Sequence, residues 1–303
     1  MSGVTVMIAS PLEAELVDRV RSVDVVGDVL YAPDLLPRPR YPCDHIGEPV
    51  AFDEAAQARW DGMLRRADVI FGYPQESSAG LARSLEIGRT IRFVQGTSAG
   101  MGAHVQRAQL PADVLARVAF ASAAGVHGGM LAEFAFYGLL ALRKDAARLA
   151  RIRAERSWEH FAMGELDGSV IAILGLGQIG VALAARARAF GMNVIALTRS
   201  GNAHPAADES LPTTELRNVA PRVDALAITL PITDATTRMV SAEVIGALPA
   251  RAVLINVGRG AVVDESALID ALVGGRLAGA VLDVFAHEPL ASESPPITPP
   301  FAT

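Results

Sequence analysis

Three glycines in the second half of the chain have the spacing of a turn that can hold a phosphate. Gly175, Gly177 and Gly180 form the pattern G-x-G-x-x-G between the apolar run "SVIAIL" and the run "VALAARARAF". There, the first glycine permits a tight turn, the second lets the backbone approach a pyrophosphate, and the third allows close helix packing. The turn therefore predicts a dinucleotide site that includes Gln178 and Ile179; a purely structural glycine turn is the alternative.

The end of the next predicted strand bears on which dinucleotide binds. An acidic residue there commonly takes the ribose hydroxyls of NAD, but "IALTRSG" places Thr198, Arg199 and Ser200 at this point. Arg199 could pair with a 2'-phosphate and Ser200 could donate a hydrogen bond to it. We therefore favour NADP(H) over NAD(H); the alternative is that Arg199 is a solvated loop residue and the protein uses NAD.

Charged side chains follow two later strands. Arg259 stands between two glycines after the buried run "AVLINV", at the sheet edge where ligands bind in such folds, and a purely structural role does not require a cation there. Asp283 and Glu288 follow the next apolar run and flank a Phe and a His. A solvated turn and a helix cap are the alternative roles for these two carboxylates.

The elements that position these residues alternate regularly. Near-continuous apolar strands separated by helices are typical of a parallel sheet covered on both faces. We expect a Rossmann-type domain over residues 121–290. Its strands are expected within residues 169–174, 192–200, 223–231, 251–258 and 277–285, and its helices within 181–191, 237–248 and 264–275.

The first half predicts a smaller α/β unit over residues 1–120. Strands are expected within residues 3–10, 67–74 and 90–100, with a helix at 11–23 and a proline-rich surface excursion at 31–49. A long helix beginning near Met130 follows, with a basic end. The basic end is interpreted as a solvated face or a subunit contact.

Composition limits the partners. The chain has 303 residues, 51% of them hydrophobic, and a net charge of -6, which argues against a duplex nucleic-acid partner. One cysteine permits no internal disulfide, and no run of 18 apolar residues occurs, so we expect a cytoplasmic protein with no membrane partner. The histidine and acidic residues show no metal-ligand spacing, and no metal is expected.

The segments Asn-x-Gly-Arg-Gly and Leu-Asp-Val-Phe-x-x-Glu-Pro, together with the glycine turn, resemble the D-isomer-specific 2-hydroxyacid dehydrogenases, the family of phosphoglycerate, glyoxylate and hydroxypyruvate reductases. The resemblance runs from about residue 65 to residue 290. It implies a flavodoxin-like substrate domain beside the Rossmann domain, a small 2-keto or 2-hydroxy acid substrate, and a homodimer.

The resemblance also implies roles for single residues. Arg259 matches the arginine that clamps the substrate carboxylate and keto oxygen, and Glu288 matches the glutamate that orients the acid-base histidine. Asp283 resembles the residue that meets the nicotinamide carboxamide. The implied substrate loop is Ser98, Ala99 and Gly100, and the implied cofactor contacts also include Leu230, Pro231 and Val257.

The tail departs from the family pattern. In the family a histidine follows the glutamate within a Ser/Thr-Pro-His segment, but no histidine follows Glu288 here. His287 adjoins Glu288, and neighbouring side chains usually diverge. The segment "ITPP" in the proline-rich tail, residues 291–303, has proline where the histidine is expected. The family also continues into a strand and a helix that this chain does not reach, so the chain is expected to be truncated, frame-shifted or a short natural variant.

Two classes of function stay open at this point. The first is an NAD(P)-dependent oxidoreductase acting on a small D-2-hydroxy acid or reducing a 2-keto acid such as glyoxylate or hydroxypyruvate. The second is a truncated or non-catalytic nucleotide-binding member of the same family. Loss of a general acid typically lowers a rate by about 10² to 10⁴-fold, so residual activity is compatible with the first class.

Overall fold

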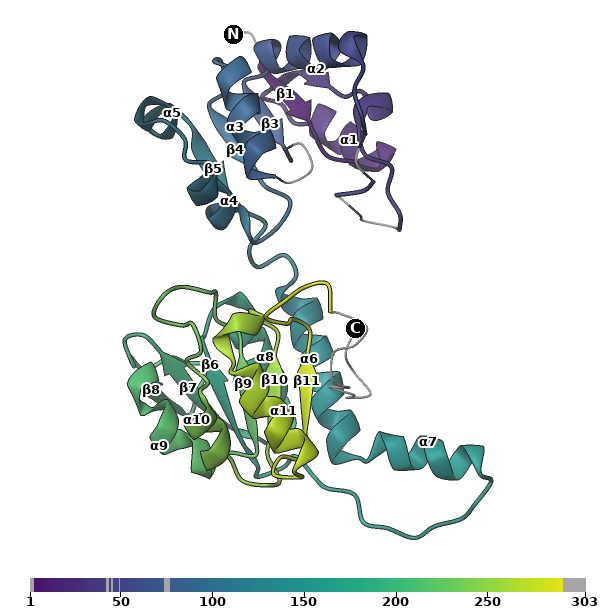
Figure 1. The fold of residues 1–303 in the computed structure, drawn as a ribbon, viewed down its shortest axis with the longest axis vertical. Helices are drawn as coiled ribbons and strands as arrows, with labels where there is room; N and C mark the ends of the chain where they lie inside the picture. The colour runs from purple at the N-terminus through teal and green to yellow at the C-terminus, as the bar shows by residue number, and fades with distance from the viewer. Residues whose placement is uncertain (1–2, 42–43, 45, 49, 74–76, 291–303) are drawn as a thin grey trace. The chain divides into compact units, whose positions relative to one another are not determined.

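The computed structural model describes residues 3–41, 44, 46–48, 50–73 and 77–290. The chain divides into two compact units, residues 1–124 and 125–303. Each unit is built on a fully parallel sheet carrying helices, drawn in Figure 1. The predicted α/β class is therefore confirmed.

The second unit contains a six-stranded sheet of order β11-β10-β9-β6-β7-β8, the order of a dinucleotide-binding fold. Its strands are β6 (Val170–Leu174), β7 (Asn193–Thr198), β8 (Glu209–Pro212), β9 (Ala225–Ile228), β10 (Val253–Asn256) and β11 (Gly279–Leu282). Leu174 at the end of β6 pairs with Leu197 and Ile228, and Asn256 pairs with Ile228 and Leu282. The turns after these strands therefore begin level with one another at one edge.

Helices cover both faces of this sheet (Figure 1). One core packs α6 (Gly128–Arg143) and α8 (Gln178–Ala189) against β6, β9 and β10. The opposite core packs α9 (Leu216–Val219), α10 (Ala242–Ala247) and α11 (Glu265–Val273) against the same strands. Because both faces are buried, every residue of β9 and β10 is buried, as the near-continuous apolar runs predict.

The prediction of one long helix from Met130 onward is wrong about the length of that helix. The structure has α6 and then a separate helix α7 (Ala146–Ala154). Asp145 between them has a left-handed backbone, φ 51°, which Asp adopts more readily than most residues. Its side chain accepts a hydrogen bond from the Arg148 backbone N–H at 3.2 Å, so Asp145 ends one helix and caps the next.

The first unit contains a five-stranded sheet of order β2-β1-β3-β4-β5. Its strands are β1 (Val4–Ile8), β2 (Val26–Leu30), β3 (Val69–Phe71), β4 (Phe93–Gln95) and β5 (Ala119–Ala121). Its helices are α1 (Ala14–Arg21), α2 (Glu54–Arg66), α3 (Ser78–Ile87), α4 (Met101–Arg107) and α5 (Ala112–Arg117). Residues of α2, α3, α4 and α5 form one core with Met7, Ile70 and Val94, whereas α1 contacts β2 and contributes no residue to that core.

The proline-rich stretch between β2 and α2 is only partly the surface excursion expected. A short 3-10 helix, Pro33–Leu35, places Leu35 and Leu36 in the buried core. Asp44 is also buried, where its carboxylate accepts hydrogen bonds from Arg40 and from the Gly47 backbone N–H. Cys43 and His45 lie outside the described residues.

Candidate functional site

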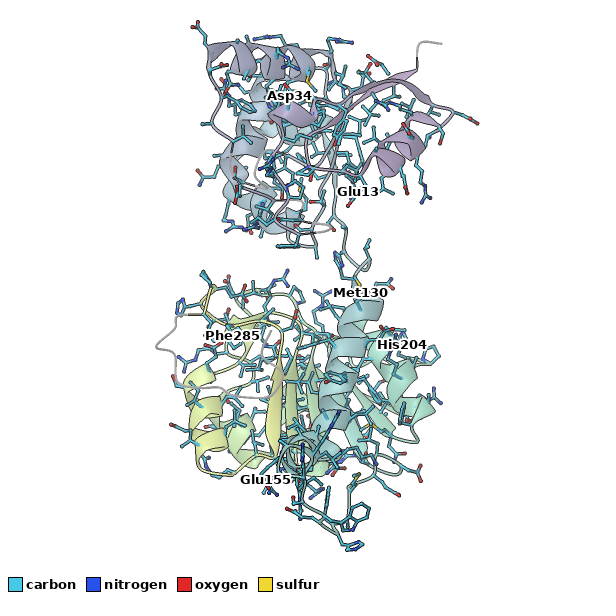
Figure 2. All side chains as sticks on the ribbon, turned by 90° about the vertical axis from the view of Figure 1, so that its right-hand side faces the viewer. Glu13, Asp34, Met130, Glu155, His204 and Phe285 are labelled. Atoms are coloured by element: carbon cyan, nitrogen blue, oxygen red, sulfur yellow. The ribbon has the colours of Figure 1, made fainter. Side chains whose placement is uncertain are left out.

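Five turns that carry predicted site residues follow the level strand ends of the second unit. They come after β6 (the glycine turn), β7 (Thr198 to Ser200), β9 (Leu230 and Pro231), β10 (Val257 to Arg259) and β11 (Asp283 to Glu288). In Figure 2 the labelled Phe285 and the labelled Met130 lie at this end of the second unit, and Glu155 lies at the other. In a doubly wound fold this edge is where ligands bind.

The glycine turn has the geometry needed to admit a pyrophosphate. Gly175 has φ 98°, and a Cβ there would crowd Leu230. A Cβ on Gly180 would collide with the carbonyl oxygen of Gly175, so α8 packs closely on the turn. Gly177 is exposed and no atom lies within 4 Å of the position its Cβ would take, which leaves its backbone open to a ligand. Gln178 begins α8 and is exposed, and Ile179 is half-buried.

The turn after β7 presents an exposed cation. Arg199 and Ser200 are exposed, and Thr198 is half-buried. The Thr198 hydroxyl accepts a hydrogen bond from the Gly201 backbone N–H at 3.0 Å, and Gly201 has φ 68°. The Thr198 side chain thus shapes the turn, while the arginine and the serine extend from it.

Arg259 is exposed. The turn that carries it is held by Asn256, a buried residue to which the sequence motifs assigned no role. The Asn256 side chain accepts a hydrogen bond from the Gly258 backbone N–H and donates one to the Arg259 carbonyl oxygen, each at 3.1 Å. The sequence feature that could have identified Asn256 is an amide side chain at the end of an apolar strand. A buried amide requires hydrogen-bond partners, so such a residue is expected to hold the turn that follows. Arg259 also donates to the Gly258 carbonyl at 2.7 Å.

Asp283 and Glu288 lie near enough to interact electrostatically. Burial, and then the charge of Glu288, raise the pKa of the half-buried Asp283 carboxyl above its ordinary value. Glu288 is exposed, and its carboxylate accepts a hydrogen bond from the Phe285 backbone N–H at 2.8 Å. Phe285 also approaches Gly260, where a Cβ would collide with the Phe285 backbone. The turns after β10 and β11 are therefore packed against each other.

The remaining predicted cofactor contacts differ in exposure. Leu230 is half-buried beside Gly175, and Pro231 is exposed. Val257 is buried and donates its backbone N–H to the Ile228 carbonyl oxygen at 3.1 Å. In this turn the Val257 side chain is therefore buried, whereas the Arg259 side chain two residues later is exposed.

Ser98, Ala99 and Gly100 lie in the first unit, in the loop between β4 and α4. The Ser98 carbonyl oxygen accepts from the Ala123 N–H at 3.1 Å, and the Gly100 carbonyl oxygen accepts from the Ala103 N–H at 3.0 Å. Within the described residues, the three backbone N–H groups of this loop donate no hydrogen bond. The loop therefore offers donors that an anion could use.

The described residues contain no group of three or more histidine, cysteine or acidic residues arranged to hold a metal ion. None of the helices in the described ranges is both long and apolar enough to cross a membrane. The segment "ITPP" lies outside the described residues.

Residues 136–301 match the family model described as "D-isomer specific 2-hydroxyacid dehydrogenase, NAD binding domain". An uncharacterized protein in the proB 3' region of Corynebacterium melassecola is 36% identical over 219 residues, 69% of this chain and 69% of that protein. Glyoxylate/hydroxypyruvate reductase B of Yersinia enterocolitica is 46% identical over 133 residues. That match covers 43% of this chain and 40% of the reductase, less than half of its length.

A solved structure supports the fold. The D-isomer specific 2-hydroxyacid dehydrogenase of Xanthobacter autotrophicus Py2, in complex with NADPH and MES, superposes with a TM-score of 0.72 at 24% identity. The superposition covers 97% of this chain and 84% of that one.

Proposed function

Because the chain belongs to the D-isomer specific 2-hydroxyacid dehydrogenases, we propose that it is an NAD(P)-dependent oxidoreductase for a small D-2-hydroxy acid or the matching 2-keto acid, such as glyoxylate or hydroxypyruvate. The observation that carries the proposal is the edge of the second sheet, where an open glycine turn and an exposed Arg259 follow strands that end level with each other. The 46% identity to a Yersinia reductase supports this substrate class.

The residues present fit a dinucleotide. The open space at Gly177 and the N-terminus of α8 would hold the pyrophosphate, with Gln178 and Ile179 beside it. Leu230, Pro231 and the Val257 backbone would line the remaining path, and Asp283 would meet the carboxamide. When bound, the nicotinamide supplies or accepts the hydride.

NADP(H) is the preferred form in this proposal. Arg199 and Ser200 are exposed at the end of β7, where no carboxylate stands to repel a 2'-phosphate, and Thr198 shapes their turn. The Xanthobacter dehydrogenase of similar fold was solved with NADPH. The competing hypothesis is a solvated Arg199 and use of NAD.

Arg259 would bind and polarise the substrate, because a guanidinium can donate two parallel hydrogen bonds to a carboxylate and a keto oxygen. Within the first unit, the backbone N–H groups of Ser98, Ala99 and Gly100 donate no hydrogen bond among the described residues, and they are the proposed donors to a carboxylate. On this assignment residues 1–120 form the substrate domain and residues 121–290 the dinucleotide domain.

The group that protonates the keto oxygen is the open part of the proposal. By the resemblance, we assign Glu288 the role of the family's orienting glutamate. The competing hypothesis is a nucleotide-binding protein without turnover.

A homodimer and a cytoplasmic location complete the proposal. On α6, Met130 and Tyr137 are 60% and 61% exposed, and beyond α7 Trp158 is 87% exposed. No residue of α7 is buried. Large apolar side chains that are exposed at several points of a segment are compatible with burial against another protein surface. A second copy that covers α6 and α7 would bury them.

The test is a paired titration and turnover assay on this chain. NADPH and NADH binding is followed by fluorescence, and oxidation of each is followed after adding glyoxylate or hydroxypyruvate. Turnover with NADPH would support the reductase. NADPH binding without turnover would favour the competing hypothesis. Absence of binding to either dinucleotide would contradict both.

A further inference from the structure

The first unit contains a cavity of about 390 Å³. Of the residues named in the preceding sections, only Leu35 lines it. Its wall includes the apolar side chains of Leu35, Phe52 and Trp60 and the polar side chains of Gln57, Ser77 and Arg83. The volume falls at the lower end of the range for small-molecule pockets, and the mixture of an apolar wall with a few polar groups is typical of them.

The cavity lies at the switch point of the first sheet. In the order β2-β1-β3-β4-β5, the chain passes from β1 to β2 on one side and then crosses back to β3 on the other side of β1. The wall includes Ala9 directly after β1, Leu35 after β2, and Ser77 at the start of α3, which follows β3. In open parallel sheets the crevice outside the strand ends at such a point is where ligands bind.

The helices α2 and α3 form two sides of the cavity, and most residues that line it from α2 are larger than those from α3. From α2 come Gln57, Trp60 and Leu64, and from α3 come Gly80 and Ser84. These spacings place each set on one helical face. Apart from Arg83, the lining residues of α3 are small, whereas those of α2 are large, and space remains between the two helices.

The apolar wall includes two aromatic rings. Trp60 is 5% exposed, and its ring lies 5.7 Å from that of Phe52 between centroids, at a tilt of 53°. Because Trp60 is 5% exposed and Phe52 is half-buried, the pair offers a ligand a limited apolar surface, which suits a small aromatic ring.

One cation is held at the wall. Arg83 is the single charged side chain among the described residues that line the cavity. Asp61, which does not line it, accepts from Arg83 at 3.2 Å and from Gln57 at 2.7 Å. The Arg83 side chain is 56% exposed, and this contact uses one of the five N–H donors of its guanidinium. The other donors remain suited to a carboxylate.

We propose that this cavity is a binding site for a small aromatic carboxylate, with its ring against Trp60 and Phe52 and its carboxylate on Arg83. The site lies wholly within the first unit and does not depend on the proposed dehydrogenase function. The positive end of the α3 dipole near Ser77 would add to the attraction.

The chain offers a direct reporter, because Trp60 and Trp158 are its two tryptophans. In a Trp158→Phe background, the fluorescence of Trp60 is titrated with phenylacetate, and phenylacetamide serves as the uncharged counterpart. We expect a saturable change with phenylacetate in the millimolar range. Phenylacetamide should bind at least about tenfold more weakly, because it cannot form the charged hydrogen bonds.

Arg83→Gln and Arg19→Gln form the matched pair. Arg19 is exposed on α1 and does not line the cavity. Arg83→Gln should weaken phenylacetate binding at least about tenfold, and Arg19→Gln should leave it unchanged. Circular dichroism checks that both variants fold. The proposal is overturned by an unsaturable response, by equal affinity for the amide, or by normal binding to the folded Arg83→Gln variant.

Discussion

The two parallel sheets differ in how completely helices cover them. In the second sheet every residue of β9 and β10 is buried. In the first sheet β3 and β4 each bury only the middle residue of three, and the half-buried neighbours include Phe71 and Phe93. The core of α2, α3, α4 and α5 lies on one face of this first sheet, and Phe71 and Phe93 do not belong to it. The second unit therefore has two cores, whereas the first has one among its described residues, and of its strands only β1, with Val6, Met7 and Ile8 all buried, approaches the coverage of the second sheet.

This difference also separates two kinds of ligand site. The second sheet combines full coverage with tight glycine turns at its edge, which suits an extended dinucleotide held by backbone groups. The first sheet has a cavity between side chains of two helices. Four measurements test these assignments, and they are given in order of decreasing expected effect.

Arg259→Ala is expected to lower kcat/KM for the keto acid by about 10³-fold, because it removes charged hydrogen bonds to the substrate. NADPH affinity should hardly change, since the pyrophosphate is assigned to the glycine turn. Arg259→Lys is the matched variant; it keeps the charge but loses the planar fork, so an intermediate rate is expected. A large loss of NADPH binding in Arg259→Ala would contradict the assigned role.

Core truncations test the coverage of the sheets. In β10, Leu254→Ala and Ile255→Ala should each cost about 3 kcal/mol, because both side chains are fully buried, one in each core. In β3, Ile70→Ala should cost about as much. Phe71→Ala, although it removes a larger side chain, should cost only about 1 kcal/mol because Phe71 is half-exposed.

Urea unfolding followed by Trp60 fluorescence and circular dichroism measures these costs, since buried Trp60 reports on the first unit. If Phe71→Ala proves more costly than Ile70→Ala, the first sheet is covered on both faces in solution, and the comparison fails.

Arg199→Ala should weaken NADPH about ten- to a hundredfold and leave NADH nearly unchanged, because only NADPH carries the 2'-phosphate. Dissociation constants measured by nucleotide fluorescence give both values. Arg188→Ala, at another exposed arginine of the same unit, is the control. Equal losses for the two nucleotides would remove the phosphate assignment.

Asp283→Asn is expected to have the smallest effect and to depend on pH. Burial and the charge of Glu288 raise the folded-state pKa of Asp283, so its ionisation is less favourable in the folded protein than in the unfolded chain. Its contribution to stability is full below the ordinary value of 3.8 and is lost as the pH rises through the raised value.

The substitution should therefore increase the free energy of unfolding at neutral pH, and the gain should shrink toward about pH 4. Denaturation at several pH values measures it, with the exposed Asp234→Asn as control. A gain that does not vary with pH would show that the charge of Asp283 is not its cause.

Prediction from the sequence succeeded where apolar runs are long. All five strands expected in the second unit lie where the structure has β6, β7, β9, β10 and β11. The strand β8 (Glu209–Pro212) was not predicted, because its sequence "ESLP" has a mixed pattern and a proline. Most helices of the first unit and its strands β2 and β5 were also missed, since short, half-buried elements leave weak periodicity.

The sequence by itself determined the α/β class, the glycine turn and the positions of Arg259 and Glu288, because these follow from local spacing after buried strands. Only the tertiary structure decided which turns begin level at one edge, that Asn256 holds the Arg259 turn, and that Asp145 divides a helix expected to be continuous. The same holds for the cavity beside Trp60. Its walls come from segments that are distant in sequence, so no local pattern could reveal it.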